Sequence, residues 1–140
     1  MDTVSFLNKV PLFHSLNKKQ LEQLSSWLVK REYKAGQAIV EQGKGGEGFF
    51  IIVSGKAEAT RVKADGTKTV VNQFGPTDYF GELALLDDGI RTATVVATEN
   101  VECLVLVRWD FIAKLETNAD MAVKILQELA ARFRHALDAM

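Results

Sequence analysis

The sequence predicts a mainly β fold with flanking helices. Its centre is a jelly-roll-like β-roll of the eight-stranded type with a short internal helix, and it lies between an N-terminal helix and two C-terminal helices. Two observations support this prediction. From residue 30 to residue 108, short runs rich in β-branched and aromatic residues are separated by glycines, which is typical of a sandwich or barrel of short strands. Before and after that region, apolar residues recur at the spacing of an amphipathic helix.

Length and composition predict one domain over residues 1–140. Of its residues, 47% are hydrophobic and 25% are charged, as in ordinary globular proteins. The changes in periodicity divide this domain into an N-terminal helical segment (1–29), the β-roll (30–108) and a C-terminal helical segment (109–140).

The first helix is predicted from about Asn17 to Leu28, because leucines recur there at helical spacing. Asn17 and Gln20 have the spacing of a capping box, which marks a helix start. Pro11 precedes this helix, so we expect a short turn that leads in from a frayed N-terminal segment.

The β-roll is predicted from runs such as "GFFIIVSG", "KAEATRV", "KTVVNQFG" and "VECLVLVR". Asp65-Gly66 is typical of the turn of a hairpin between two of these strands. The run "ELALL" is too short for a full helix and is expected to form one or two helical turns. Trp27 and Trp109 are expected to pack at the two ends of the roll.

Two helices are predicted after the roll, over residues 109–116 and 119–139, with Asn118 as the cap of the second. One face of the second helix carries apolar residues at every fourth position: Ile125, Leu129, Phe133 and Leu137.

Charge and cysteine content exclude several classes of function. A net charge of −1 gives no basic field for direct nucleic-acid binding. The single cysteine, Cys103, excludes an internal disulfide and a cysteine-ligated metal site, and predicts a reducing, cytoplasmic setting. No targeting segment or membrane-length apolar run is present, so we expect no membrane insertion. His14 and His135 have no metal-ligand spacing, and no nucleophile–base pair stands out, so we expect no metal, no cofactor and no enzymatic activity.

The stretch "FGELALLDDGIRTATV" (80–95) contains one glutamate and one arginine around an apolar run. Gly81 permits close approach of a ligand, and the amides of Leu83 and Ala84 at the start of a short helix form a natural anion site. Arg91 offers a planar fork for two oxygens of one phosphate. Glu82 beside a phosphate requires a hydroxyl donor, such as that of a ribose. An intramolecular ion pair between Glu82 and Arg91 is the structural alternative.

"FGELALL" followed by "RTATV" resembles the phosphate-binding cassette of cyclic nucleotide-binding domains, here residues 80–94. That family includes regulatory subunits of cyclic-AMP-dependent kinase, cyclic-nucleotide-gated channels and the bacterial catabolite activator. "YKAGQAIVEQGKGGEGFFIIVSG" (33–55) is similar to the glycine-punctuated strands of the family. Thr77 departs from the pattern, because many members have a glycine in this turn.

The resemblance implies a role for each cassette residue. Arg91 would pair with the cyclic phosphate, assisted by the amides of Leu83 and Ala84, and Glu82 would accept a hydrogen bond from the ribose 2′-hydroxyl. Thr92 would lie near the phosphate and the base; alternatively it only opens a strand. The ligand-binding set is completed by Gly81 and Ala93.

The implied function is a regulatory sensor of a 3′,5′-cyclic nucleotide, cAMP or cGMP, in which ligand binding repositions the C-terminal helix. That helix is also where a homodimer or an effector domain would make contact. The alternative is a ligand-free domain of the same fold that serves as a protein-interaction module. The sequence leaves the choice between cAMP and cGMP open.

Overall fold

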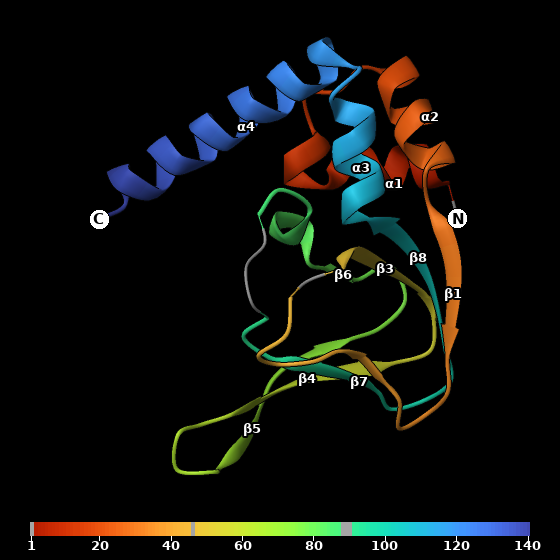
Figure 1. Cartoon of the computed structure of the whole chain (residues 1–140), viewed down its shortest axis with the longest axis vertical. Helices are drawn as coiled ribbons and strands as arrows, with labels where there is room; N and C mark the ends of the chain where they lie inside the picture. The colour runs from red at the N-terminus through yellow and green to blue at the C-terminus, as the bar shows by residue number, and fades with distance from the viewer. Residues whose placement is uncertain (1, 46, 88–90) are drawn as a thin grey trace. The chain divides into compact units, whose positions relative to one another are not determined.

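The computed structural model describes residues 2–45, 47–87 and 91–140. They form two compact units: a helical unit, residues 1–27 with 110–140, and a roll unit, residues 28–109. Figure 1 shows the helices and strands of each unit along the chain.

The helical unit is built from both ends of the chain. Its elements are α1 (Thr3–Lys9), the 3₁₀ helix η1 (Pro11–Phe13), α2 (Lys18–Ser26), α3 (Arg108–Leu115) and α4 (Ala119–Asp138). The first two residues of α3 belong to the roll unit. The capping box predicted for Asn17 and Gln20 is confirmed at the start of α2. The expectation of a frayed N-terminal segment is wrong, because Asp2 caps α1 through the Ser5 N–H and Leu7 is fully buried.

Aromatic side chains pack together within the helical unit. Phe111 of α3 makes edge contacts with Phe13 and Trp27, at centroid distances of 6.2 and 6.5 Å. The Lys114 ammonium lies 5.3 Å from the centre of the Trp27 ring, within range of a cation–π interaction. The expectation that Trp109 packs at an end of the roll is wrong, since its side chain is 64% exposed.

The buried amide of Gln20 joins α2 to α4. Its Oε1 accepts from the Asn17 N–H at 2.9 Å and from Lys124 Nζ at 3.0 Å, and its Nε2 donates to Asp120 Oδ2 at 2.6 Å. These three bonds satisfy most of the hydrogen-bonding capacity of a side chain that is only 6% exposed. Gln20 therefore links the start of α4 to α2.

The roll unit consists of two four-stranded antiparallel sheets, with strand orders β1-β8-β3-β6 and β2-β7-β4-β5. The strands are β1 (Val29–Tyr33), β2 (Ala38–Val40), β3 (Gly48–Ser54), β4 (Ala57–Val62), β5 (Lys68–Phe74), β6 (Tyr79–Phe80), β7 (Thr94–Ala97) and β8 (Val101–Val107). Apolar side chains of both sheets meet in one core cluster, which includes Phe50, Ile52, Val95 and Cys103. Burial raises the pKa of the Cys103 thiol to about 11, so it is neutral at pH 7.

The β4–β5 hairpin extends beyond the other strands of its sheet (Figure 1). Its turn is the predicted one: the Lys63 N–H donates to the Thr67 carbonyl, and the Thr67 N–H donates to Asp65 Oδ1. The register shifts within the hairpin, because Ala59 pairs with Asn72 and Thr60 pairs with Val70. Val71 therefore has no partner on β4 and forms a β-bulge.

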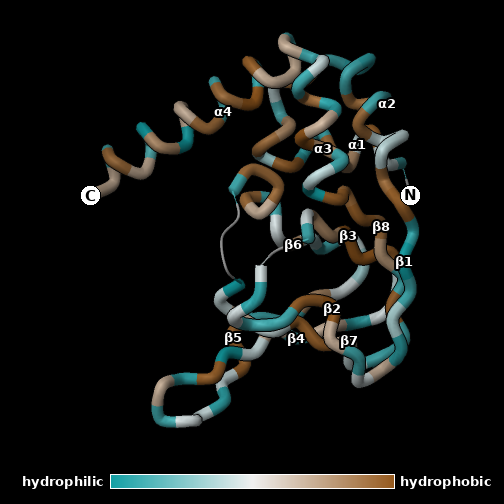
Figure 2. Tube along the Cα trace, viewed as in Figure 1, coloured by the Kyte–Doolittle hydropathy of each residue, from teal (hydrophilic) through white to brown (hydrophobic). Residues whose placement is uncertain are grey.

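Helix α4 starts at the predicted cap, with Asn118 Oδ1 accepting from the Met121 N–H. Met121 and Ile125 are buried, whereas Phe133 is 65% and Leu137 50% exposed. The predicted apolar face is thus buried only in its first turns, and Figure 2 shows hydrophobic segments continuing along the rest of the helix. No helix in the described ranges combines the length and the hydropathy needed to cross a bilayer.

Candidate functional site

Two backbone hydrogen bonds fix Arg91 beside the loop that follows β2. Its N–H donates to the Lys44 carbonyl at 2.8 Å, and its carbonyl accepts from the Gly43 N–H at 2.9 Å. Gln42, in the same loop, donates its N–H to Thr94 Oγ1 at 2.9 Å. The residue that the sequence singled out is therefore held in a fixed backbone position.

The Arg91 guanidinium is half-buried and points toward β3. Its Nη2 donates to the Gly48 carbonyl at 2.7 Å, while its buried Nε has no hydrogen-bond partner among the described residues. Burial lowers the pKa of this guanidinium, and the carboxylates of Glu47 and Asp87 act in the opposite direction. Arginine remains protonated at this site nonetheless.

No carboxylate of the described residues lies within ion-pair distance of Arg91. Glu47 is held by Arg31 instead, at 2.6 Å. The predicted alternative, an ion pair between Glu82 and Arg91, is absent from the described interactions. A partly desolvated cation that has one carbonyl partner favours an anionic ligand.

Gly81 lies against this guanidinium. Its φ of 86° is in the left-handed region, and a Cβ at this position would be 2.6 Å from Arg91 Nη1 and 2.5 Å from the Gly48 carbonyl oxygen. Only glycine satisfies both the conformation and the space. The preceding residue, Phe80, stacks on Phe50 at a centroid distance of 5.1 Å, which fixes β6 to the core.

The run "ELAL" forms η2 (Glu82–Leu85), a single 3₁₀ turn as predicted for this short segment. Of the two amides predicted to form an anion site, that of Ala84 is not free, because its N–H donates to the Gly81 carbonyl at 3.1 Å. Leu83 is exposed and Ala84 is buried, and Glu82 is half-buried. Within the predicted cassette 80–94, residues 88–90 lie outside the described ranges.

Arg91, Thr92 and Ala93 line one cavity of about 310 Å³ in the roll unit. The other lining residues come from β2, β4, β5, β6 and β7: Val40, Ala59, Arg61, Val71, Asn72, Phe74, Phe80 and Val95. This volume lies at the lower end of the range for small-molecule sites. The structure thus brings three of the predicted residues, Arg91, Thr92 and Ala93, to one cavity. Gly81 lies next to the Arg91 guanidinium.

A second cleft, of about 500 Å³, lies at the Ser54 end of β3. Its wall contains Glu32 and Glu102, and both carboxylates pair with Lys30, at 3.6 and 3.1 Å. Because these charges already have partners, the smaller cavity with Arg91 is the better candidate for ligand binding.

Sequence reasoning missed several residues of the cavity. Arg61 and Asn72 line it, and Gly48 provides the carbonyl that holds Arg91. For Arg61 a signal was present: in "KAEATRV", residues 57, 59 and 61 alternate onto one face of the strand. Asn72 follows the β-bulge at Val71, which the sequence pattern does not reveal.

Thr77 has a φ of 73° and is the non-glycine residue with positive φ among those described. A β-branched side chain is strained in this conformation. The turn is nevertheless held on β3, because the Thr77 N–H donates to the Ile52 carbonyl and the Ile52 N–H donates to the Asp78 carbonyl, both at 2.8 Å. Thr77, which stands where many members of the family have glycine, therefore keeps a left-handed backbone conformation.

A family model described as "Cyclic nucleotide-binding domain" matches residues 30–118, which is more than half of the chain. The chain belongs to this family. The match covers residues 30–109 of the roll unit, which include the predicted cassette 80–94.

Two relatives and one solved structure illustrate the similarity of this cyclic nucleotide-binding domain to known proteins. It is 35% identical to the cyclic AMP receptor protein of Thermus thermophilus over 90% of its own length and 58% of that protein's. It is 47% identical to a cAMP-dependent protein kinase regulatory subunit of Mycosarcoma maydis, over 66% of its own length and 17% of that protein's. The N-terminal domain of a transcriptional regulator from Streptomyces coelicolor superposes with a TM-score of 0.87 and 31% identity, covering 100% of this chain and 96% of that one. The chain thus spans little more than half the length of the first relative and less than a fifth of the length of the second.

Replacing Gly81 by alanine should destabilise the domain more than replacing Gly66, whose φ of 87° is similar but which has no atom near a Cβ. Gly66→Ala carries only the left-handed backbone cost, about 1 kcal/mol. Gly81→Ala adds the collision with Arg91 and Gly48, roughly 1–3 kcal/mol more. Urea unfolding of both variants measures the difference. Equal losses would show that the close packing of Gly81 on Arg91 does not contribute to stability.

Proposed function

We propose that this domain binds a 3′,5′-cyclic nucleotide, cAMP or cGMP, and acts as a regulatory sensor. The observation that carries the proposal is the half-buried Arg91 guanidinium, which lines the cavity and has no carboxylate partner among the described residues. A cyclic phosphate carries one negative charge and two exocyclic oxygens, which suit this planar fork. The names of the relatives, a cyclic AMP receptor and a cAMP-dependent kinase subunit, support the ligand class.

Each predicted site residue has a role in this proposal. Arg91 neutralises the phosphate, and the amides of Leu83 and Ala84 donate hydrogen bonds to it. The Ala84 N–H then divides its hydrogen bond between the phosphate and the Gly81 carbonyl. Glu82 accepts from the ribose 2′-hydroxyl. Gly81 leaves room for the guanidinium, and Ala93 leaves the cavity floor open.

Thr92 is proposed to contact the base. It lines the cavity next to Arg91, and its hydroxyl suits the 2-amino group of guanine in a syn nucleotide. A threonine there supports acceptance of cGMP beside cAMP.

We propose further that residues 1–140 act as one cytoplasmic sensor domain whose C-terminal helix responds to ligand. Helix α4 is buried only at its start, and its exposed apolar residues Leu126, Phe133 and Leu137 suit contact with a second copy or an effector domain. Binding shifts such a helix only if the nucleotide binds one of its positions better than the other. Among the described residues, no catalytic constellation suggests an enzyme. A ligand-free interaction module, the alternative function, would have no use for the carbonyl-held Arg91.

Arg91→Ala should weaken nucleotide binding by about 2 kcal/mol or more, a factor of roughly 30, because the buried phosphate loses its charge partner. Arg91→Lys should recover little, since an ammonium lacks the fork. Calorimetric titration with cAMP and cGMP measures both. Lys56→Ala removes an exposed charge paired with Glu99 at 3.9 Å and serves as the matched control. Wild-type affinity in the Arg91→Ala variant would reject the phosphate assignment.

A 2′-deoxy cyclic nucleotide should bind the wild-type domain markedly less well than its ribose counterpart, because the Glu82 carboxylate loses its hydroxyl donor. In Glu82→Gln this gap should narrow. The gap is measured by competition with one fluorescent nucleotide. An unchanged gap removes Glu82 from the ribose contact.

Nucleotide should change amide hydrogen exchange from about Met121 to the end of α4, together with the exchange of the described cassette residues. Exchange is followed by mass spectrometry with and without saturating cAMP. Removal of residues from Leu126 onward should weaken binding while Arg91→Ala still has its full effect. If exchange changes only around the cassette and the truncated chain binds equally well, α4 is not the responding element.

A further inference from the structure

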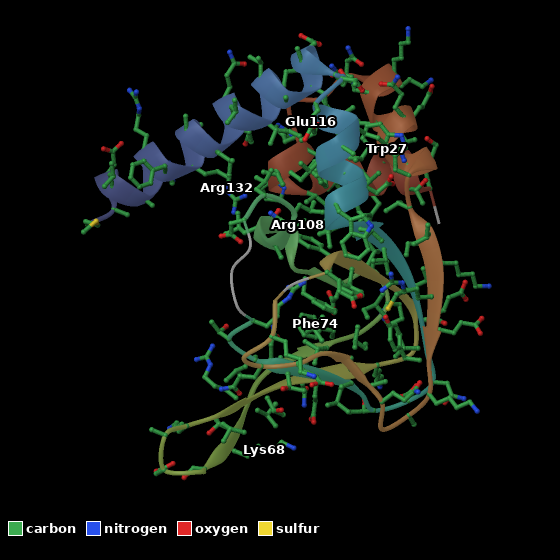
Figure 3. All side chains as sticks on the ribbon, viewed as in Figure 1. Trp27, Lys68, Phe74, Arg108, Glu116 and Arg132 are labelled. Atoms are coloured by element: carbon green, nitrogen blue, oxygen red, sulfur yellow. The ribbon has the colours of Figure 1, made fainter. Side chains whose placement is uncertain are left out.

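The outer part of the β4–β5 hairpin extends past the strand that pairs with β4 on its other side. The β4–β7 ladder reaches only to the pair of Thr60 with Thr94, which is the first residue of β7. The β4–β5 ladder continues two residues further, to the pair of Val62 with Lys68. Lys68 lies on the outer part of the hairpin, away from Phe74 in the roll (Figure 3). At Val62, β4 has therefore passed beyond the start of β7.

The backbone of Val62 faces the side on which β7 would continue. The next N–H along the strand, that of Lys63, donates to the Thr67 carbonyl at 2.9 Å and so points toward β5. Backbone groups alternate between the two neighbours of an antiparallel strand, so the N–H and C=O of Val62 point the other way. If the β4–β7 register continued, the backbone of Thr92 would meet them there.

The side-chain amide of Gln42 occupies this place instead. Its Nε2 donates to the Val62 carbonyl at 3.0 Å, and its Oε1 accepts from the Val62 N–H at 2.8 Å. A side-chain amide has the donor and the acceptor of a peptide group, so it can substitute for the backbone of a strand. The backbone N–H of Gln42 donates to Thr94 Oγ1 at 2.9 Å. Gln42 thus connects the start of β7 to the outer part of β4.

Gln42 stands at the corner of a tight turn, residues 41–44. The Lys44 N–H donates to the Glu41 carbonyl at 3.2 Å, and Gly43 has a φ of 85°, in the left-handed region that such a turn requires of its third residue. The same turn holds Arg91, whose N–H donates to the Lys44 carbonyl at 2.8 Å and whose carbonyl accepts from the Gly43 N–H at 2.9 Å. One turn of four residues therefore holds both the hairpin and Arg91.

The substitution allows residues 91–93 to leave the sheet. These three residues line the cavity of about 310 Å³, whereas Gln42 does not. In a continued ladder the backbone of Thr92 would be bonded to Val62, but its carbonyl accepts from Arg61 Nε at 3.1 Å instead. Because Gln42 satisfies the backbone of Val62, the segment can line the cavity at no cost in unpaired polar groups on β4.

We infer that Gln42 is a positioning residue for nucleotide binding, which holds the hairpin and the Arg91 segment in the arrangement that accepts the ligand without lining the cavity itself. The inference rests on the proposed function. The Val62 side chain is 49% exposed, so water can reach this part of β4 and take over both hydrogen bonds when the amide is removed. Loss of Gln42 should therefore leave the fold intact and reduce the fraction of molecules in the binding arrangement.

Gln42→Met keeps the length of the side chain and removes both amide bonds. If the binding arrangement is then populated about a tenth of the time, the apparent affinity for cAMP falls about tenfold. The association rate of a fluorescent cyclic nucleotide should fall by the same factor while its dissociation rate stays unchanged, as stopped-flow fluorescence measures. Arg91→Ala removes a contact to the ligand and should instead raise the dissociation rate. Gln42→Glu keeps the acceptor for the Val62 N–H and loses only the donor, so its association rate should fall less.

Hydrogen exchange of the free domain checks the structural part of the inference. In Gln42→Met the Val62 N–H should exchange faster, because it has lost its acceptor. The Lys63 N–H, which is bonded to the Thr67 carbonyl within the hairpin, should keep its protection. The urea midpoint of each variant verifies that it folds.

The matched control is Gln73→Met, the same loss of an amide on β5. The Gln73 Nε2 donates to Glu58 Oε1 at 3.3 Å, and the residue does not line the cavity. This variant should keep the wild-type affinity and both rates. Wild-type association in Gln42→Met, unchanged exchange at Val62, or a raised dissociation rate with unchanged association would each overturn the inference. If the wild-type domain binds no cyclic nucleotide, the proposed function fails and this inference falls with it.

Discussion

The bond from the Arg91 guanidinium to the Gly48 carbonyl is the contact around which the site is arranged. It places a cation in a partly desolvated position, which is unfavourable unless the surrounding backbone holds it there. Three segments of the roll unit supply that support. The loop after β2 fixes its backbone, β3 accepts from its side chain, and Gly81 leaves the space it occupies.

The strands explain why this support is rigid. Residues 48–52 of β3 are all buried, so this strand lies inside the roll unit with side chains covered on both faces. Gly48 itself approaches the Leu106 carbonyl so closely that no side chain fits there. The β5 strand is the opposite case, exposed along nearly its whole length. One wall of the cavity thus belongs to the buried core, and the other to the β4–β5 hairpin at the edge of its sheet. The Gln42 side chain holds this hairpin by hydrogen bonds to the backbone of Val62.

Local patterns in the sequence predicted most of the fold and the central residue of the site. Periodicity and glycine spacing gave the roll, and the spacing of Asn17 and Gln20 gave the start of α2, because these signals depend on neighbours in the chain. The α1 helix was missed, since a single cap at Asp2 and a single buried leucine are weak signals. The roles of Gly48 and Asn72 depend on close approach between distant segments and on a register shift, and neither follows from local sequence.

The one cysteine of the chain is useful because of its location. Cys103 is fully buried in the core of the roll, and its raised pKa keeps it as a thiol rather than the nucleophilic thiolate. Thiolates that solvent can reach attack maleimides and thiol-reactive spin labels. A cysteine introduced on the exposed side of α4 would therefore take up a spectroscopic label selectively, with the native Cys103 left in place. The domain can therefore be labelled at chosen sites without first replacing its native cysteine.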